Sequence, residues 1–184
     1  MKHGMPKLFV VLLFILLSVG IASPQAQVSK EYQIKAVFLF NFTRFIEWPG
    51  TAFREVNEPF VIGILGNDPF GSYIDETVRG ENLNGHPLVV KRFKTPDEVE
   101  RCHILFINVS DKDDLKTTFE KVKNQPILTV GDVASFAKQG GMIRFTTENN
   151  KTRIRINLEA AKVADLTISS KLLKLAEIVE MQSN

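Results

Sequence analysis

Cysteine, histidine and tryptophan are all scarce in this sequence, and the scarcity limits its chemistry. Cys102 is the only cysteine, so no disulfide can form within the chain. It stands at the start of an apolar run, which predicts a buried thiol and not a reactive one. His103 follows it directly, and neighbouring residues on a strand point to opposite faces. Cys102 and His103 therefore cannot act together as a nucleophile and its base.

Catalytic and metal-binding motifs are also missing. The sequence has no G-x-S-x-G elbow, no H-E-x-x-H pair and no glycine-rich loop followed by Lys and then Ser or Thr. The acids Asp111, Asp113 and Asp114 lack the spacing and the glycine of a calcium loop, and they match the first turn of a helix. We therefore predict no catalytic residue, no metal ion and no cofactor. If the protein were an enzyme, His86 and Asp132 would be the residues to test.

The chain has little net charge and no apolar run long enough to cross a bilayer. Its formal charge of +2 falls to about zero once Lys2 and Lys7 are removed, which argues against nucleic acid as a partner. The apolar run Leu8–Gly20 is shorter than the roughly 20 residues of a membrane span. With the lysines before it and Gly-Ile-Ala at its end, it is typical of a secretory signal peptide. We predict a signal peptide at residues 1–22 and one exported, soluble domain at residues 23–184.

Short apolar runs alternate with helical patterns through the middle of the chain. Four of these runs are bounded by turn residues and are typical of buried strands: Phe60–Leu65, Leu88–Phe93, Ile104–Val109 and Ile127–Val130. Helices are expected between them at Ser72–Val78 and, with Ser110 as the cap, up to Lys123. This alternation predicts a layered α/β domain with a mixed, largely parallel sheet.

The stretch from Glu31 to Trp48 predicts an amphipathic helix that Pro49 terminates. Its apolar stripe contains Ile34, Val37, Phe38, Asn41, Phe42 and Phe45. Phe40 falls in the middle of the polar arc instead. Either another segment covers this ring, or Phe40 and Trp48 are exposed aromatic contacts for a protein partner.

Two strands near the C-terminus flank the sequence Glu-Asn-Asn-Lys, which is typical of a hairpin turn. A turn centred on Asn149 and Asn150 sets Arg144 opposite Arg155. Like charges that face each other destabilise a hairpin, so either a nearby acid neutralises a solvated face or this face is a basic patch for an acidic partner. The predicted partner-binding surface contains Phe40, Trp48, Met142, Arg144, Arg155 and Asn157, with Glu159 orienting the arginines.

The chain is expected to end in a helix. Ser169 or Ser170 would cap this element. Its buried stripe would contain Leu172, Leu175, Ala176 and Val179. The predicted α/β domain is therefore completed by a C-terminal β-hairpin and a terminal helix.

A small-molecule site is the alternative to a protein-binding surface. In an open α/β sheet, ligands bind beyond the carboxyl ends of the strands. The loops at these ends would present Asn67, Asp68, Ser110 and Asp132. Each of these residues also has an ordinary turn or capping role, so the sequence leaves both alternatives open.

Several stretches, taken together and in order, resemble the YfiR-like family of periplasmic proteins. They are EYQIKAVFLFNFTRFIEWPG, FVIGILGNDPFG, CHILFINVS, ILTVGDVASFAKQGGMIRF and RIRINLEAAK-ADL-ISSKLLKLAEIV. The resemblance runs over nearly the whole of the predicted mature chain.

This resemblance implies an α/β regulator that is not an enzyme. Family members sit in the periplasm and repress a membrane-anchored diguanylate cyclase by binding its periplasmic sensor region, which controls cyclic di-GMP and biofilm formation. The expected partners are such a cyclase or another membrane sensor, an outer-membrane lipoprotein that removes the inhibitor, and a second copy of the chain in a homodimer. Some relatives carry structural or redox-sensitive disulfides, which Cys102 alone cannot form within this chain.

Overall fold

The computed structural model describes residues 28–134 and 136–179, so the predicted signal peptide at residues 1–22 lies outside the described part of the chain. The strands are β1 (Ile46–Glu47), β2 (Phe60–Gly66), β3 (Asn82–Leu83), β4 (His86–Phe93), β5 (Ile104–Asn108), β6 (Leu128–Gly131), β7 (Ile143–Glu148), β8 (Lys151–Asn157), β9 (Thr167–Ile168) and β10 (Ala176–Val179). The α-helices are α2 (Lys30–Phe45), α3 (Ser72–Val78), α4 (Lys112–Val122), α5 (Leu158–Val163) and α6 (Ser170–Leu173). Short 3-10 turns are η1 (Gly50–Ala52), η2 (Pro96–Glu98) and η3 (Ala137–Gln139).

An eight-stranded sheet organises the domain. Its strand order is β10-β8-β7-β6-β5-β2-β4-β3. The central pairs from β4 to β7 are all parallel, whereas β3 with β4 and β7 with β8 are antiparallel. The predicted mixed, largely parallel α/β sheet with a C-terminal hairpin is therefore confirmed.

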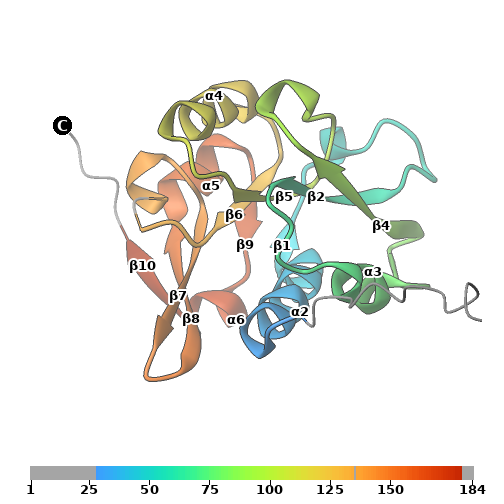
Figure 1. Cartoon of the computed structure of the whole chain (residues 1–184). Coiled ribbons are helices and arrows are strands. Elements are labelled where there is room, and N and C mark those ends of the chain that lie inside the picture. Colours follow the sequence, from blue (N-terminus) through green and yellow to red (C-terminus); the bar gives the residue numbers. More distant parts are fainter. Residues whose placement is uncertain (1–27, 135, 180–184) are drawn as a thin grey trace, which may run out of the picture.

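Helices cover this sheet on two sides, and each side has its own core. On one face, α2 and α3 pack with the alternate strand residues that include Ile62, Phe106 and Phe145. On the other face, α4 packs on the remaining set, which includes Leu65 and Ile107. Figure 1 shows the two layers, with α4 above the sheet and with α2 and α3 below it. The near-continuous burial of the central strands follows from this arrangement, because a parallel sheet is covered on both faces.

Helix α2 forms where the sequence predicts a helix, but a different stripe is buried. Ser29 caps it by accepting a hydrogen bond from the Tyr32 backbone N–H, and the helix ends at Phe45 because the next residues pair with β9. The buried residues are Lys35, Ala36, Leu39, Phe42 and Thr43, whereas Ile34 and Val37 are 39% and 42% exposed. The predicted stripe is therefore partly wrong. Apolarity alone could not show that Lys35 would be buried with acidic partners.

The C-terminal segment differs most from the prediction. The expected last helix is only the four residues of α6, capped by Ser169, and the chain then continues as the strand β10. Leu172 is buried as expected, but Leu175 is 66% exposed. The physical reason is that β10 pairs in parallel with β8, and its backbone hydrogen bonds cover a sheet edge that a helix would have left open. One smaller correction concerns α4, whose cap is Asp111 and not Ser110.

The hairpin of β7 and β8 has the predicted register. Arg144 lies opposite Arg155, and Phe145 lies opposite Ile154. Asn149 and Asn150 form the turn with φ angles of 51° and 59°. Positive φ at both central residues is the geometry of a type I′ turn, whose twist matches that of the flanking strands.

This turn gives a first testable prediction. We expect Asn150→Gly to leave the free energy of unfolding within about 0.5 kcal/mol of the wild type, because Asn-Gly is the preferred type I′ pair. Asn150→Val should lower it by about 1–2 kcal/mol, because a β-branched residue is strained in the left-handed region. Urea denaturation of the two variants tests this prediction, and equal stabilities would contradict it.

Candidate functional site

The two facing arginines belong to a single row of residues that crosses the sheet. Successive strands pair Leu65 with Ile107, Ile107 with Gly131, Gly131 with Arg144, and Arg144 with Arg155. On β10, Glu177 pairs with Arg155 and completes the row. Directly opposite residues share one face of a sheet, so the arginines lie on the same face as the core beneath α4.

The buried core on this face stops before it reaches the arginines. Phe136 is fully buried and packs so closely on Gly131 and Gly141 that a Cβ at either glycine would overlap its ring. No described residue of β7, β8 or β10 belongs to the core beneath α4. Arg144 and Arg155 thus continue the core row onto a part of the sheet that is partly open to solvent.

The two arginines differ in their electrostatic partners. The Arg155 guanidinium lies 2.9 Å from Glu177 Oε2 and 3.5 Å from Glu148 Oε1. Arg144 makes no ion pair with any described residue, and its Nε is buried without a hydrogen-bond partner in this part of the chain. Burial and the neighbouring Arg155 charge lower the pKa of Arg144 and outweigh the opposing attraction of Asp132, whose carboxylate pairs with Lys35. Arg144 is therefore a partly desolvated cation that still needs an anionic partner.

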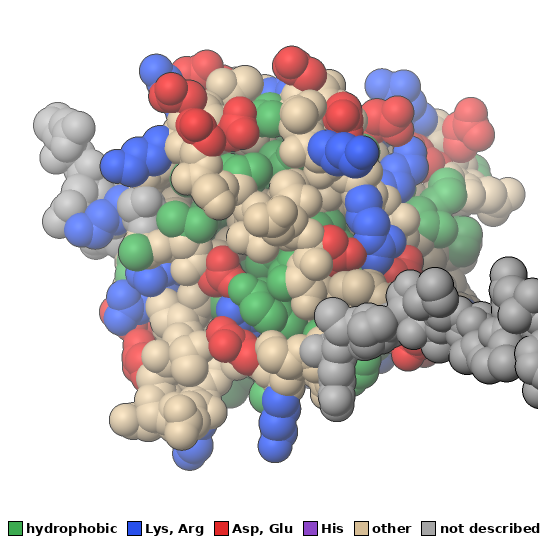
Figure 2. All heavy atoms as spheres, in the orientation of Figure 1, with side chains coloured by type: hydrophobic (Ala, Val, Ile, Leu, Met, Phe, Trp, Pro, Cys, Tyr) green, Lys and Arg blue, Asp and Glu red, His purple; other side chains and the backbone are tan. Residues whose placement is uncertain are grey.

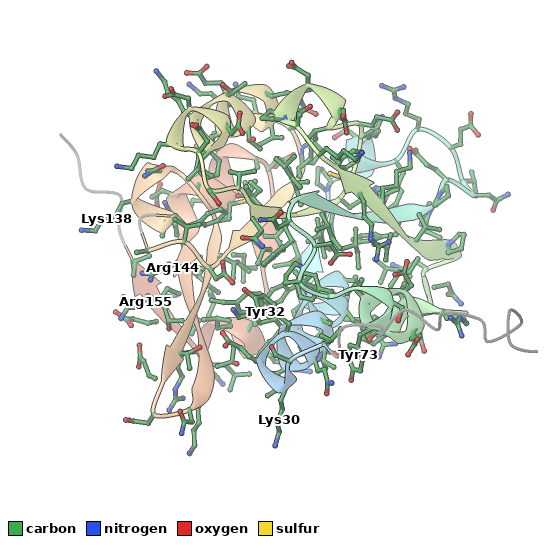
Figure 3. All side chains as sticks on the ribbon, viewed as in Figure 1. Lys30, Tyr32, Tyr73, Lys138, Arg144 and Arg155 are labelled. Atoms are coloured by element: carbon green, nitrogen blue, oxygen red, sulfur yellow. The ribbon has the colours of Figure 1, made fainter. Side chains whose placement is uncertain are left out.

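A polar basin of about 440 Å³ lies beside Arg144 and Arg155 at the carboxyl end of β6. Lys35, only 3% exposed, places Nζ 2.8 Å from both Asp132 Oδ2 and Glu31 Oε1. The Tyr32 hydroxyl donates to Asp132 over 3.0 Å. Burial alone would lower the pKa of Lys35, but the hydrogen bonds that Lys35 donates to Asp132 and Glu31 outweigh it and raise the pKa. In Figure 3, Tyr32 lies near the centre of the view, and Arg144 and Arg155 lie toward the left edge.

Three predicted contact residues on or beside the hairpin have structural roles instead. Met142 is 6% exposed and Asn157 is fully buried, so neither belongs to an open surface. Asn157 caps α5 and donates to the Ala137 carbonyl, because η3 and α5 fold over this end of the strands. Glu159 pairs with Lys162 at 2.7 Å and does not orient the arginines.

The two predicted aromatic contacts lie away from the arginines. Phe40 is partly buried against the core, with the Arg44 guanidinium 4.7 Å from its ring centre. Trp48 packs edge-on against Phe60, with ring centres 4.9 Å apart. Neither ring is part of the Arg144 site, and both act in packing.

The alternative ligand residues are also mostly dispersed. Asp68 accepts hydrogen bonds from the Phe70 and Gly71 backbone and pairs with Arg92, so its carboxylate is already occupied. Asn67 and Ser110 are exposed turn residues outside the basin. Of the four residues predicted to bind a ligand, only Asp132 lines the basin.

The basin also contains Lys35, Tyr32 and Glu31, which were not predicted from the sequence as site residues. The only signal for them was a lysine within an otherwise apolar stretch. That lysine lies one turn after Glu31, which is the spacing of a helical ion pair.

Of the residues with potential nucleophilic or acid–base chemistry, Cys102 and His103 are buried, whereas His86 and Asp132 are partly exposed. Cys102 is 2% exposed, and burial raises its pKa to about 12. His103 is 1% exposed, and burial lowers its pKa to about 4. Its Nδ1 accepts from the Val61 backbone N–H, so the ring serves the packing of the fold. Within residues 28–134 and 136–179, no cluster of three His, Cys, Asp or Glu could hold a metal ion.

A separate, mostly apolar groove of about 700 Å³ lies between α4, η3 and α5. Phe119, Val122, Met142, Ala160 and Val163 contribute its apolar walls. Lys112, Lys116 and Lys123 border it, together with Asp113 and Glu120. Its size is within the range of small-molecule sites in proteins.

The buried ion pair beneath the basin gives a second prediction. Asp132→Ala should lower the free energy of unfolding by about 1–3 kcal/mol, because Lys35 keeps only Glu31 as an acidic partner. Lys35→Met in the Asp132→Ala background should recover part of this loss. Chemical denaturation of both single variants and the double variant measures the coupling. Strictly additive effects would show that the two side chains are not coupled.

Comparison with known proteins indicates the family of this chain. Among the described residues, no helix is both long and apolar enough to cross a membrane. A search of curated proteins gives no match. A family model described as YfiR/HmsC-like matches residues 32–177, which include the hairpin, most of the residues that line the basin and nearly all of the sheet. Members of this family are periplasmic regulators of diguanylate cyclases and are not enzymes. Because the match covers most of its length, the chain belongs to the YfiR/HmsC-like family.

Proposed function

We propose that this protein represses a membrane-anchored diguanylate cyclase from the periplasmic side by binding its sensor region. The family relationship supports the regulatory role and the partner. An outer-membrane lipoprotein would compete for the inhibitor, and a homodimer would be its resting form. The protein would lower cyclic di-GMP by contact alone.

The surface around Arg144 and Arg155 is the proposed contact. The single observation that carries this choice is Arg144, a partly desolvated arginine without an ion pair among the described residues. Arginine is enriched at interfaces, where its planar group can bind a carboxylate through two hydrogen bonds. A carboxylate from the partner would supply the anion that Arg144 lacks, whereas Arg155 already has Glu148 and Glu177.

A charge-reversal experiment tests this contact. We expect Arg144→Glu with Arg155→Gln to weaken binding of the full-length cyclase in membranes by at least about tenfold, because a repulsive charge replaces an attractive one. Glutamine is chosen at position 155 because a glutamate there would face Glu148 and Glu177 and destabilise the hairpin. Cyclase activity and bound inhibitor are measured together.

Arg79→Glu is the matched control, because Arg79 is an exposed arginine at the end of α3. The control should repress like the wild type, and all variants should unfold at similar temperatures. Unchanged binding by the Arg144 and Arg155 variant would remove this surface from the proposal. Absence of repression by the wild type would refute the proposed function itself.

The apolar groove between α4 and α5 favours a second candidate function, a periplasmic sensor module that binds a small molecule for a membrane receptor. The groove does not contain the residues predicted for a ligand, namely Asn67, Asp68, Ser110 and Asp132. Its walls would select an apolar or amphipathic molecule.

Laurate serves as the probe for this second candidate. By mass action, a ligand of the folded state at about 100 times its Kd should stabilise the protein by about 2.7 kcal/mol and raise the melting temperature. Val163→Asp should abolish the rise, because it places a charge at the groove, where Val163 is 57% exposed. Leu175→Asp is the control, since Leu175 is equally apolar and 66% exposed but does not line the groove. The same rise in all three proteins would refute binding in the groove.

A further inference from the structure

Four basic residues from three elements form a basic strip on the hairpin side of the molecule. The strip contains Lys138 of η3, Arg144 of β7, and Arg155 and Arg153 of β8. In Figure 3, Lys138, Arg144 and Arg155 lie close together in the view, at the edge of the molecule that carries β10. Figure 2 shows basic side chains along the same edge, with acidic side chains among them.

The positive charge of this strip is only partly neutralised. Arg155 pairs with Glu148 and Glu177, whereas no ion pair or hydrogen bond within the described chain engages the side chains of Lys138, Arg144 or Arg153. Thr146, opposite Arg153, is uncharged. The strip therefore keeps excess positive charge at the place where the core beneath α4 ends.

The uncovered sheet face and the spacing of its arginines favour a helix as the partner segment. An α/β sheet is ordinarily covered by helices, and α4 covers the other half of this same face. Arg153 and Arg155 are two residues apart on one strand, which places them about 6.7 Å apart along β8. Residues four apart on a helix are separated by about 6 Å along its axis. Acids at positions i and i+4 of a helix that follows β8 would thus meet both arginines.

We propose that the basic strip binds a helix whose exposed face carries Asp or Glu at i, i+4 spacing. This inference rests on the proposed function and specifies the chemistry of the partner segment. A further carboxylate on the side of that helix nearer β7 would reach Arg144, which faces Arg155 across the hairpin. The helix would complete the cover of the sheet face and supply the missing counter-charges.

Synthetic peptides test this proposal without the cyclase. The first probe is an alanine-rich helical peptide of about 15 residues with Glu at i, i+4 and i+8. The second has the same number of Glu residues at alternate positions among Thr and Val, which favours a strand. We expect the helical peptide to bind at least about tenfold more tightly, and to weaken as salt rises from about 0.05 to about 0.5 M.

Variants connect this binding to the strip. Arg144→Glu with Arg153→Glu should lower the affinity for the helical peptide by at least about tenfold, whereas Arg79→Glu with Lys94→Glu should not. The two control residues are exposed and lie outside the strip. Circular dichroism spectra and melting temperatures are measured to check that all the variants fold.

Three outcomes of the peptide experiment would overturn the proposal. They are equal or tighter binding of the strand peptide, no binding of the helical peptide, and binding that the strip variant leaves unchanged. Binding to vesicles that contain phosphatidylglycerol is measured as well. If the vesicles bind through the strip and the helical peptide is not preferred over the strand peptide, the surface is a membrane-binding surface instead. If the strip variant still represses the cyclase, this inference fails while the proposed function stands.

Discussion

The alternation of side chains across one pleated sheet determines where every functional group of this protein can lie. Each central strand sends one set of side chains toward α2 and the other toward α4. Arg144 and Arg155 belong to the second set, and the pairing of β6 with β7 places Arg144 directly beside Gly131. Because Phe136 fills the space over that glycine, the apolar core ends there and the charged part of the same row begins.

A buried ion pair links the first helix to this arrangement. Lys35 points from α2 toward Asp132, which follows the last residue of β6, and Tyr32 donates to the same carboxylate. A lysine that is 3% exposed is tolerated only because acids satisfy it. The pair therefore holds the N-terminal part of α2 against the carboxyl edge of the sheet and forms one wall of the polar basin.

The chemistry of the described residues suits recognition better than turnover. The thiol of Cys102 and the imidazole of His103 are buried, with pKa values moved away from neutrality. The carboxylates Asp68 and Asp132 are occupied by basic partners. The unsatisfied charge lies instead on a partly open sheet face, where a regulator of the YfiR/HmsC-like family could be recognised by a complementary protein.

Local patterns of residues were enough to predict the elements that local physics controls. Apolar runs bounded by turn residues located the central strands, and two adjacent asparagines fixed the hairpin turn and set Arg144 against Arg155. The packing of the whole domain, in contrast, sets which of these residues are open to solvent. Met142 and Asn157 share the arginine face but are buried beneath η3 and α5, and Lys35 is buried because Asp132, almost 100 positions along the chain, lies beside it. The segment Ala176–Val179 became a strand because β8 offered an unpaired edge. The contact between Lys35 and Asp132 and the pairing of β10 with β8 join residues that are far apart in sequence, so local spacing and polarity do not specify them.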